Sequence, residues 1–416
     1  NPAQTDHLDA NLENLLKPET CAGCHPEHYR EWSGSMHAYA STDPIFLAMN
    51  QRGQRETGGE LGAFCVQCHA PLALALGQTF DGLNLEAVPS HLQGVTCAFC
   101  HSVIDAGHAK HNNPLNVQLD GILAGPIHDP LPTDAHGSRY SPLLDSGHPS
   151  SARMCGVCHD VVVPSGHHLE RTFAEWETSS YAASATTCGD CHLPGYLGKV
   201  ANLEDAPIRT IHSHAMPAVD LALTPFPETR AQKFAVQASL DPVVGARLCV
   251  QERASETTVE LQLWNRIAGH SFPSGSTQDR RLQVQLIGLV NGESTWRDTS
   301  WTLGRKMLGA QGERVLMFWE AHQSIGEVLP APCANKANHD CAENIVRYRS
   351  FSAPMRLDEV QVQVRLDPME NEVLESLIDS GDLDPSFLSK KQSFLLKNPS
   401  ISWRQGMGSC VESNLL

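Results

Sequence analysis

A five-residue pattern, Cys-x-x-Cys-His, occurs five times in this chain and limits its fold more than any other feature does. The copies read CAGCH, CVQCH, CAFCH, CGVCH and CGDCH, and together they contain ten of the 14 cysteines. At the chain's own Cys and His frequencies, chance would supply about 0.02 copies of the pattern. The repeats therefore share one explanation. They begin at Cys21, Cys65, Cys97, Cys155 and Cys188.

The spacing has a chemical reason. Two thiols three residues apart on one turn can each form a thioether to a porphyrin vinyl group, and the adjacent His then meets the iron. Zinc sites pair two Cys motifs and need no His after each second Cys, so zinc ribbons and disulfides are the weaker interpretations. We therefore expect five covalently bound haem c groups. The expected thioether residues are Cys21, Cys24, Cys65, Cys68, Cys97, Cys100, Cys155, Cys158, Cys188 and Cys191, and the expected proximal iron ligands are His25, His69, His101, His159 and His192.

The charge balance and the start of the chain bear on partners and location. Lys plus Arg number 30 against 47 Asp plus Glu, so the formal net charge is -17 and the chain repels nucleic acid and anionic lipid. No apolar run approaches the roughly 20 residues of a spanning helix, so we expect no membrane insertion. The chain opens at Asn1 without Met or a leader, and haem is attached outside the cytoplasm. We expect an exported, processed chain that is periplasmic, extracellular or at the cell surface.

The haem motifs occupy residues 21–192, about 34 residues per haem, which is too few for a separate core around each one. We therefore expect the porphyrins to pack against one another among short helices and irregular loops. This predicts a mostly irregular, short-helix pentahaem cytochrome c domain over residues 1–225. A Pro-rich segment, 201–229, is the expected join to the second half of the chain.

The second half of the chain has a different pattern. Residues 257–263, 282–286 and 360–364 alternate apolar and polar side chains with period two, which predicts half-buried strands. Asn291-Gly292 is typical of a hairpin turn, and a helix is expected near residues 370–378. These features predict an all-β, sandwich-like, antiparallel C-terminal domain over residues 226–416. It serves either as a cap on the haems or as a binding module.

Four cysteines, all after residue 240, lie outside the haem motifs. An even number in an exported chain favours disulfides, although four cysteines allow three pairings. We expect Cys333 to pair with Cys341 and Cys249 with Cys410. Four free thiols are the alternative.

Sixteen histidines remain after the five proximal ones, and 13 of these lie between residues 7 and 214. A second imidazole would make each iron six-coordinate and low-spin, which suits electron transfer. The supply of His exceeds the five distal positions. Met ligands would raise the reduction potential and are the minority interpretation. They are Met36, Met49, Met154 and Met216.

Residues around the motifs form a series that extends over about residues 20–220. They are Pro26 and Glu31-Trp32-x-x-Ser35-x-His37-Ala38 after the first motif, Gly94-Val95-Thr96 before the third, Gly125-Pro126 and His136 after it, Asp160 after the fourth, Glu175-Trp176-x-x-Ser179-x-Tyr181-Ala182 before the fifth, and Ser213-His214 after it. In this order they resemble the nitrifier-type tetrahaem cytochrome c family and its larger relatives, which include extracellular filament-forming cytochromes. The fifth haem motif and the β-domain depart from the tetrahaem pattern.

The resemblance implies which histidines are distal ligands. His37, His136 and His214 are the first candidates. His270 lies in Gly269-His270-Ser271-Phe272-Pro273-Ser274-Gly275, which resembles a signature of the β-domain in many multihaem cytochromes, and it is either a ligand reaching across the domain boundary or a structural His. The weaker candidates are His91, His212, His270, His108 and His111.

The leading interpretation is an electron-transfer protein, not an enzyme, whose partners are redox proteins or an extracellular electron acceptor. A homopolymer that forms a filament is a further expectation, and His7 would then be a candidate ligand for a neighbouring subunit. The rival is a haem oxidoreductase that acts on a small nitrogen or sulfur compound at a five-coordinate haem. Such an enzyme needs an open iron position and a proton source.

Overall fold

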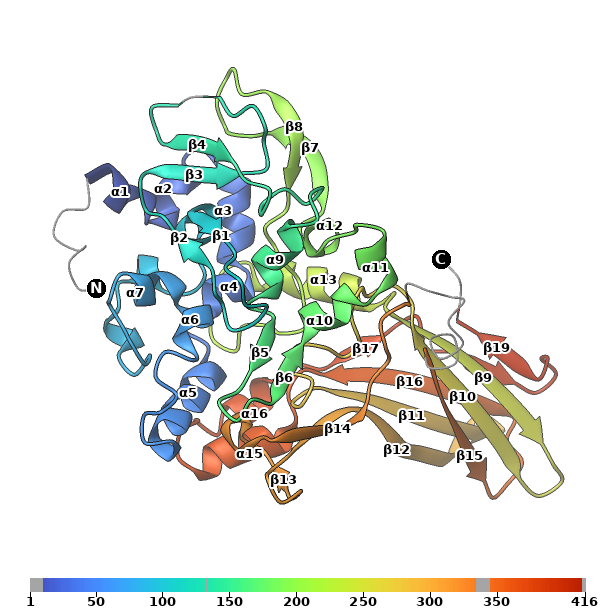
Figure 1. Ribbon diagram of the computed structural model, residues 1–416. Helices are drawn as coiled ribbons and strands as arrows, with labels where there is room; N and C mark the ends of the chain where they lie inside the picture. Colours follow the sequence, from blue (N-terminus) through green and yellow to red (C-terminus); the bar gives the residue numbers. More distant parts are fainter. Residues whose placement is uncertain (1–9, 132, 334–344, 414–416) are drawn as a thin grey trace. The chain divides into compact units, whose positions relative to one another are not determined.

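The computed structural model describes residues 10–131, 133–333 and 345–413, and it divides into two compact units (Figure 1). Unit 1 comprises Asn1–His168, Ala185–Ala235 and Leu374–Lys390, and unit 2 comprises Leu169–Ser184, Val236–Val373 and Lys391–Leu416. Within the described residues, no helix has the length and apolar character needed to cross a membrane. The domains 1–225 and 226–416 stay a prediction.

Unit 1 is built mostly from short helices. Several begin with proline, whose fixed φ and missing N–H suit the first helical turn. The longest, α5, begins at Pro44, and Asp43 caps it by accepting a hydrogen bond from the Ile45 N–H at 3.0 Å. The helices are α1 (Ala10–Leu15), α2 (Pro18–Ala22), α3 (Pro26–Ser33), α4 (Met36–Tyr39), α5 (Pro44–Glu56), α6 (Val66–His69), α7 (Pro71–Ala75), η1 (Leu85–Ala87), η2 (Ser90–Leu92), α8 (Cys97–His101), α9 (Ser151–Gly156), α12 (Cys188–His192) and α16 (Phe387–Lys390).

Small two-stranded sheets accompany these helices. Strands β1 and β2 pair antiparallel, β3 and β4 parallel, and β7 and β8 antiparallel. A buried apolar cluster that includes Val66, Leu72 and Phe99 gives unit 1 a protein core. The strands are β1 (Val103–Asp105), β2 (Asn116–Val117), β3 (Ile122–Gly125), β4 (Gly137–Tyr140), β5 (Asp160–Val162), β7 (Gly195–Lys199) and β8 (Ile208–His212).

Unit 2 contains two larger sheets. One has the order β15-β10-β9-β19, and the other has the order β13-β12-β11-β16-β17, with β14 paired to β12 and β18 paired to β16. Every described strand pair in these two sheets is antiparallel. The strands are β9 (Val244–Glu252), β10 (Thr257–Asn265), β11 (Arg281–Val290), β12 (Glu293–Leu308), β13 (Arg314–Val315), β14 (Gln323–Glu327), β15 (Val346–Ala353), β16 (Glu359–Asp367), β17 (Phe394–Leu396), β18 (Ser402–Arg404) and β19 (Cys410–Glu412).

The helices of unit 2 are α10 (Thr172–Glu177), α11 (Ser180–Ala183) and η3 (Phe318–Glu320). Three elements contain residues of both units: β6 (His168–Arg171), α13 (Thr229–Leu240) and α15 (Asn371–Asp379).

The strands and the turn expected from sequence alternation are confirmed. The three predicted runs lie in β10, β11 and β16, and in β10 the side chains of Val259, Leu261 and Leu263 are fully buried while Glu260 is exposed. Asn291 and Gly292 have positive φ values of 53° and 82° and connect β11 to β12, as a tight hairpin turn requires. The expected helix near residues 370–378 is α15. Short helices and many strands in sheets are thus the observed fold class.

A disulfide joins Cys249 of β9 to Cys410 of β19, where the two residues are paired in the sheet. This is the pairing we expected. Cys333 is also disulfide-bonded, and its expected partner Cys341 lies outside the described residues.

The Cys249–Cys410 bond supports a stability prediction. It links residues 161 apart in sequence, so it removes much conformational freedom from the unfolded chain. The double variant Cys249→Ala/Cys410→Ala should lose about 2–5 kcal/mol of unfolding free energy. Urea unfolding followed by near-ultraviolet circular dichroism measures the loss. An unchanged midpoint and slope would contradict it.

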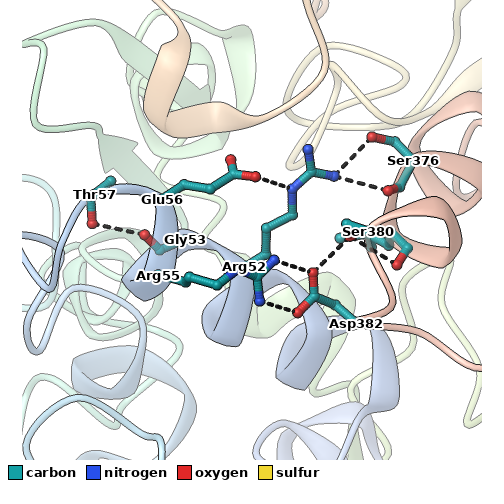
Figure 2. A network of polar contacts seen from close by, with 9 residues as sticks. Arg52, Gly53, Arg55, Glu56, Thr57, Ser376, Ser380 and Asp382 are labelled. Carbon is teal, nitrogen blue, oxygen red and sulfur yellow. Dashed lines mark hydrogen bonds and ion pairs between the residues drawn. The ribbon is translucent and has the colours of Figure 1, made fainter.

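The C-terminal segment Leu374–Lys390 of unit 1 is bound to helix α5, as Figure 2 shows. Arg55 makes two hydrogen bonds to the carboxylate of Asp382, at 2.6 and 2.7 Å, and this contact lowers the pKa of Asp382. Arg52 donates to the backbone and the hydroxyl oxygen of Ser376, at 3.0 and 2.8 Å. Unit 1 therefore includes residues from near both ends of the chain.

Candidate haem sites

Each Cys-x-x-Cys-His motif folds as one helical turn. The His25 N–H donates to the Cys21 carbonyl at 2.7 Å, and the second and fourth motifs repeat this bond. The third and fifth motifs are the helices α8 and α12 themselves. Residues three apart on a helical turn lie on one face, so both sulfurs of a motif face the same way. This is the geometry that two thioether bonds to one porphyrin need.

The motif cysteines form no disulfides. All ten are unpaired in the structure. Burial raises the pKa of Cys65 and of Cys100 to about 12 each, so both thiols are protonated at neutral pH. No cluster of three or more His, Cys, Asp or Glu with metal-binding geometry occurs in the described part of the chain.

Contacts between sulfurs connect the five motifs. The Cys97 thiol donates a hydrogen bond to Cys21, the Cys188 thiol to Cys155, and the Cys158 thiol to Cys68. Cys100 acts on both thiols of motif 4: it opposes the lowering of the Cys155 pKa by the hydrogen bond with Cys188, and it adds to the raising of the Cys158 pKa by the hydrogen bond with Cys68. Motif 1 therefore adjoins motif 3, and motif 4 adjoins motifs 2, 3 and 5. These atoms are the predicted thioether sulfurs.

The predicted proximal histidines are oriented by backbone carbonyls. The Nδ1 of His25 bonds the Val200 carbonyl at 2.9 Å, and that of His101 bonds the Ala124 carbonyl at 2.6 Å. A carbonyl only accepts, so Nδ1 carries the proton and the ring lone pair lies on Nε2, the tautomer that an iron ligand requires. The same arrangement joins His69 to Ala40 at 3.0 Å and His192 to Pro217 at 2.9 Å.

Two of the first distal candidates lie opposite proximal histidines. The ring centroids of His37 and His159 are 6.1 Å apart, and those of His214 and His101 are 6.4 Å apart. Two metal–nitrogen bonds of about 2 Å each, plus the ring radii, fill such a gap. Burial lowers the pKa of His37 and of His214 to about 3, so both are neutral, as ligands must be.

His136, the remaining member of the first three distal candidates, lies near His25. It contributes to lowering the pKa of His25, after the larger effect of burial, and its own Nδ1 bonds the Gly137 carbonyl at 3.0 Å. The structure thus brings a candidate distal His beside the proximal residues of motifs 1, 3 and 4. The assignments themselves stay predictions.

The other candidates occupy varied positions. His212 donates Nδ1 to the Leu193 carbonyl at 2.7 Å and lies beside His214. His91 is half-buried in η2, and none of the ring contacts described for this chain sets it beside a proximal His.

His270 belongs to unit 2, where its Nδ1 bonds the Ser271 carbonyl at 2.8 Å. His111 faces His168 with ring centroids 6.3 Å apart. His7 lies outside the described residues.

Sequence reasoning did not single out His28. It lies one helical turn after His25, and its ring is 4.7 Å from that of His214 and 6.0 Å from that of His25. Burial, followed by the effect of His25, lowers its pKa to about 4. It is a neutral imidazole between motifs 1 and 3. The sequence signal that could have identified His28 is its position three residues after a predicted proximal His.

Two buried arginine side chains have hydrogen-bond donors without a partner, and these donors suit the carboxylates of a porphyrin. A terminal nitrogen of Arg139 and the Nε of Arg153 are buried without a hydrogen-bond partner. Arg139 is paired in register with Ala124, whose carbonyl holds His101, and Arg153 precedes Cys155 by two residues. A buried guanidinium donor needs an acceptor, and haem propionates supply carboxylate oxygens. The residues present therefore fit haem.

An acidic residue near motif 2 gives a pH-dependent prediction. Desolvation raises the pKa of Asp43 to about 7, against the hydrogen bond from the Ile45 N–H, and Asp220 adds to the rise. Between pH 4 and 7 the unfolded state loses this proton while the folded state keeps it, so Asp43 makes the fold less stable as pH rises.

Asp43→Asn keeps a helix-capping side chain and removes this penalty. Relative to the wild type, the variant's advantage in unfolding free energy should grow by about 2–4 kcal/mol between pH 4 and 7. Above pH 7 the difference should stay constant. Urea unfolding at several pH values measures the difference. The control is Glu60→Gln, an exposed carboxylate. A difference that stays constant with pH would refute the assignment.

Comparisons with known proteins agree with this geometry. A family model described as cytochrome c554 and c-prime matches residues 20–102. The fold is similar to the crystal structure of a penta-haem cytochrome c552 from Thermochromatium tepidum. The TM-score is 0.64 at 19% identity, and the match covers 92% of this chain and 97% of that one. No curated protein sequence matches the chain.

Proposed function

We propose that this chain is a multihaem c-type cytochrome that carries single electrons through five covalently bound haems and catalyses no reaction of its own, which the family match over residues 20–102 and the similarity in fold to a penta-haem cytochrome support. The observation that supports this most directly is the set of sulfur contacts that links all five motifs, through motif 3 and motif 4. Haem supplies one-electron chemistry, and the protein supplies spacing and axial ligands.

The polypeptide's part in this function is to fix the ligands and keep them neutral. Backbone carbonyls accept from Nδ1 of His25, His69, His101 and His192 and so fix the tautomer of these rings, and the burial of His37 and His214 keeps their imidazoles unprotonated. Ligands that do not move or change protonation make electron transfer fast, because little reorganisation accompanies it. We propose bis-His ligation for most of the haems.

We also propose that the chain is exported and that it works outside the cytoplasm with redox proteins or an extracellular acceptor. The motif chemistry supports this, because covalent haem attachment takes place after export. A more specific form of this proposal is that copies of the chain assemble end to end into a filament. In the proposed domain layout, residues 1–225 carry the haems and residues 226–416 form the β-domain.

The test uses protein matured in a host with a haem-attachment system. We expect the intact mass to include five haems, the ferric electron paramagnetic resonance spectrum to be low-spin, and a small reductant to reduce every haem without a substrate. A stoichiometric high-spin signal, together with turnover of nitrite or hydroxylamine, would favour the haem oxidoreductase instead. Electron micrographs of the native protein separate filaments from discrete particles.

A further inference from the structure

A phenyl ring is stacked on the predicted proximal imidazole of motif 2. The ring centroids of Phe46 and His69 are 4.1 Å apart, and the two ring planes differ by 8°. Phe46 lies in helix α5 and is 9% exposed, as part of the buried apolar cluster of unit 1. The rings that face His101 and His159 are imidazoles, whereas the side chain of Phe46 has only carbon atoms to offer. Phe46 therefore contacts His69 without being able to bind iron.

The stacked ring limits how the imidazole can turn. A bond from Nε2 to iron lies in the plane of an imidazole, so a ring on the imidazole's face lies beside that bond and not along it. Rotation about the bond would push the His69 ring into Phe46. The Nδ1 of His69 also bonds the Ala40 carbonyl at 3.0 Å. One contact thus fixes the edge of the imidazole, and the other fixes its face.

Both contacts come from one anchored stretch of chain. The side chain of Tyr39, next to Ala40, is buried, and its hydroxyl is hydrogen-bonded to that of Thr224 at 2.8 Å. Phe46 lies in the first turn of α5, and the C-terminal segment of unit 1 binds the second half of the same helix (Figure 2). All of these residues belong to unit 1, so the surroundings of His69 are fixed within one compact unit.

We propose that Phe46 is a positioning residue for the haem of motif 2, because it holds the plane of the His69 imidazole and covers one face of that ring. The inference rests on the proposed function, since it requires a haem at motif 2. Groups that orient an axial ligand and exclude water from it tune the reduction potential of the metal. An apolar cover favours the less charged, reduced iron, so Phe46 should raise the potential of this haem.

The first test variant is Phe46→Leu, which keeps an apolar side chain and removes the flat ring. We expect the low-spin electron paramagnetic resonance signal of one haem to shift and broaden, because the imidazole plane is no longer fixed. We also expect the reduction potential of the same haem to fall, because leucine covers the imidazole less completely. Phe46→Tyr restores a ring at this position and should keep both the wild-type signal and the wild-type potential.

The matched control is Leu85→Ala, which removes about as many carbon atoms from the same buried cluster. It should lower the midpoint of urea unfolding as much as Phe46→Leu does and leave every haem signal and potential unchanged. The same spectral changes in Leu85→Ala would overturn the proposal, since lost packing alone would then explain them. Unchanged signals and potentials in Phe46→Leu would overturn it as well.

A variant without the haem of motif 2 identifies the haem that responds. Cys65→Ala/Cys68→Ala should lack the signal that shifts in Phe46→Leu, and adding Phe46→Leu to it should change none of the remaining signals. A shift among the remaining haems would contradict the assignment to motif 2. If the matured wild type carries no haem at motif 2, the proposed function fails. If it carries that haem and Phe46→Leu has no effect, only the positioning role fails.

Discussion

The double variant Cys155→Ala/Cys158→Ala should carry four of the five haems and should no longer pass electrons among all of those that remain. Motif 4 is the junction of the sulfur contacts, since its cysteines lie beside Cys68, Cys100 and Cys188. Without its haem, the haem sites of motifs 2 and 5 lose the neighbour that connects them to motif 3. The expected effect is large because motif 4 has sulfur contacts with three of the other four motifs.

Intact mass gives the haem count, and photochemical injection of a single electron followed by absorbance gives the equilibration among haems. We expect the equilibration to split into separate, incomplete phases. The control is Cys21→Ala/Cys24→Ala, which also loses one haem but removes motif 1, whose sulfur contact runs to motif 3. Its remaining haems should still equilibrate as one group. Equal behaviour of the two variants would show that motif 4 is no junction.

The second large effect is expected at His37. This residue lies opposite His159, and burial lowers its pKa to about 3. His37→Ala should make one haem five-coordinate, so that a high-spin ferric signal appears and the reduced protein binds carbon monoxide. His37→Met should keep six ligands and raise the potential of that haem, because thioether ligation favours the reduced iron within the roughly 0.8 V range that axial ligands span.

Redox titration followed by optical spectroscopy resolves the shifted haem. His148→Ala is the control, because the Nδ1 of His148 accepts the Ser150 N–H at 3.2 Å within its own loop. It should leave the spectrum and all potentials unchanged. A low-spin His37→Ala protein would remove His37 from the ligand set and with it the pairing to His159.

The haem chemistry could be predicted from the sequence because it depends on local spacing. Two cysteines and a histidine on one turn need no tertiary information, and the strand pattern of residues 257–263 follows equally from period-two alternation. The resemblance to known families marked His37 as a distal candidate, but only the structure sets it opposite His159, which is 122 positions away in the printed sequence. Composition gave only the surplus of histidines.

The acceptors that orient the proximal histidines could not be predicted. They are backbone carbonyls, such as those of Ala124 and Pro217, and every residue has one, so no side-chain pattern marks them. The contacts of two glutamates were equally hidden. The sequence shows Glu31 and Glu175 as parts of a motif. The group that each carboxylate binds lies on a loop far away in sequence, so only the structure shows it.

The attachment of Leu374–Lys390 to helix α5 has a consequence for biogenesis. The ion pair of Arg55 with Asp382 joins a segment made early in translation to one made near its end. Unit 1 therefore cannot reach its final form until residues 374–390 have been made, long after its last Cys-x-x-Cys-His motif at Cys188–His192.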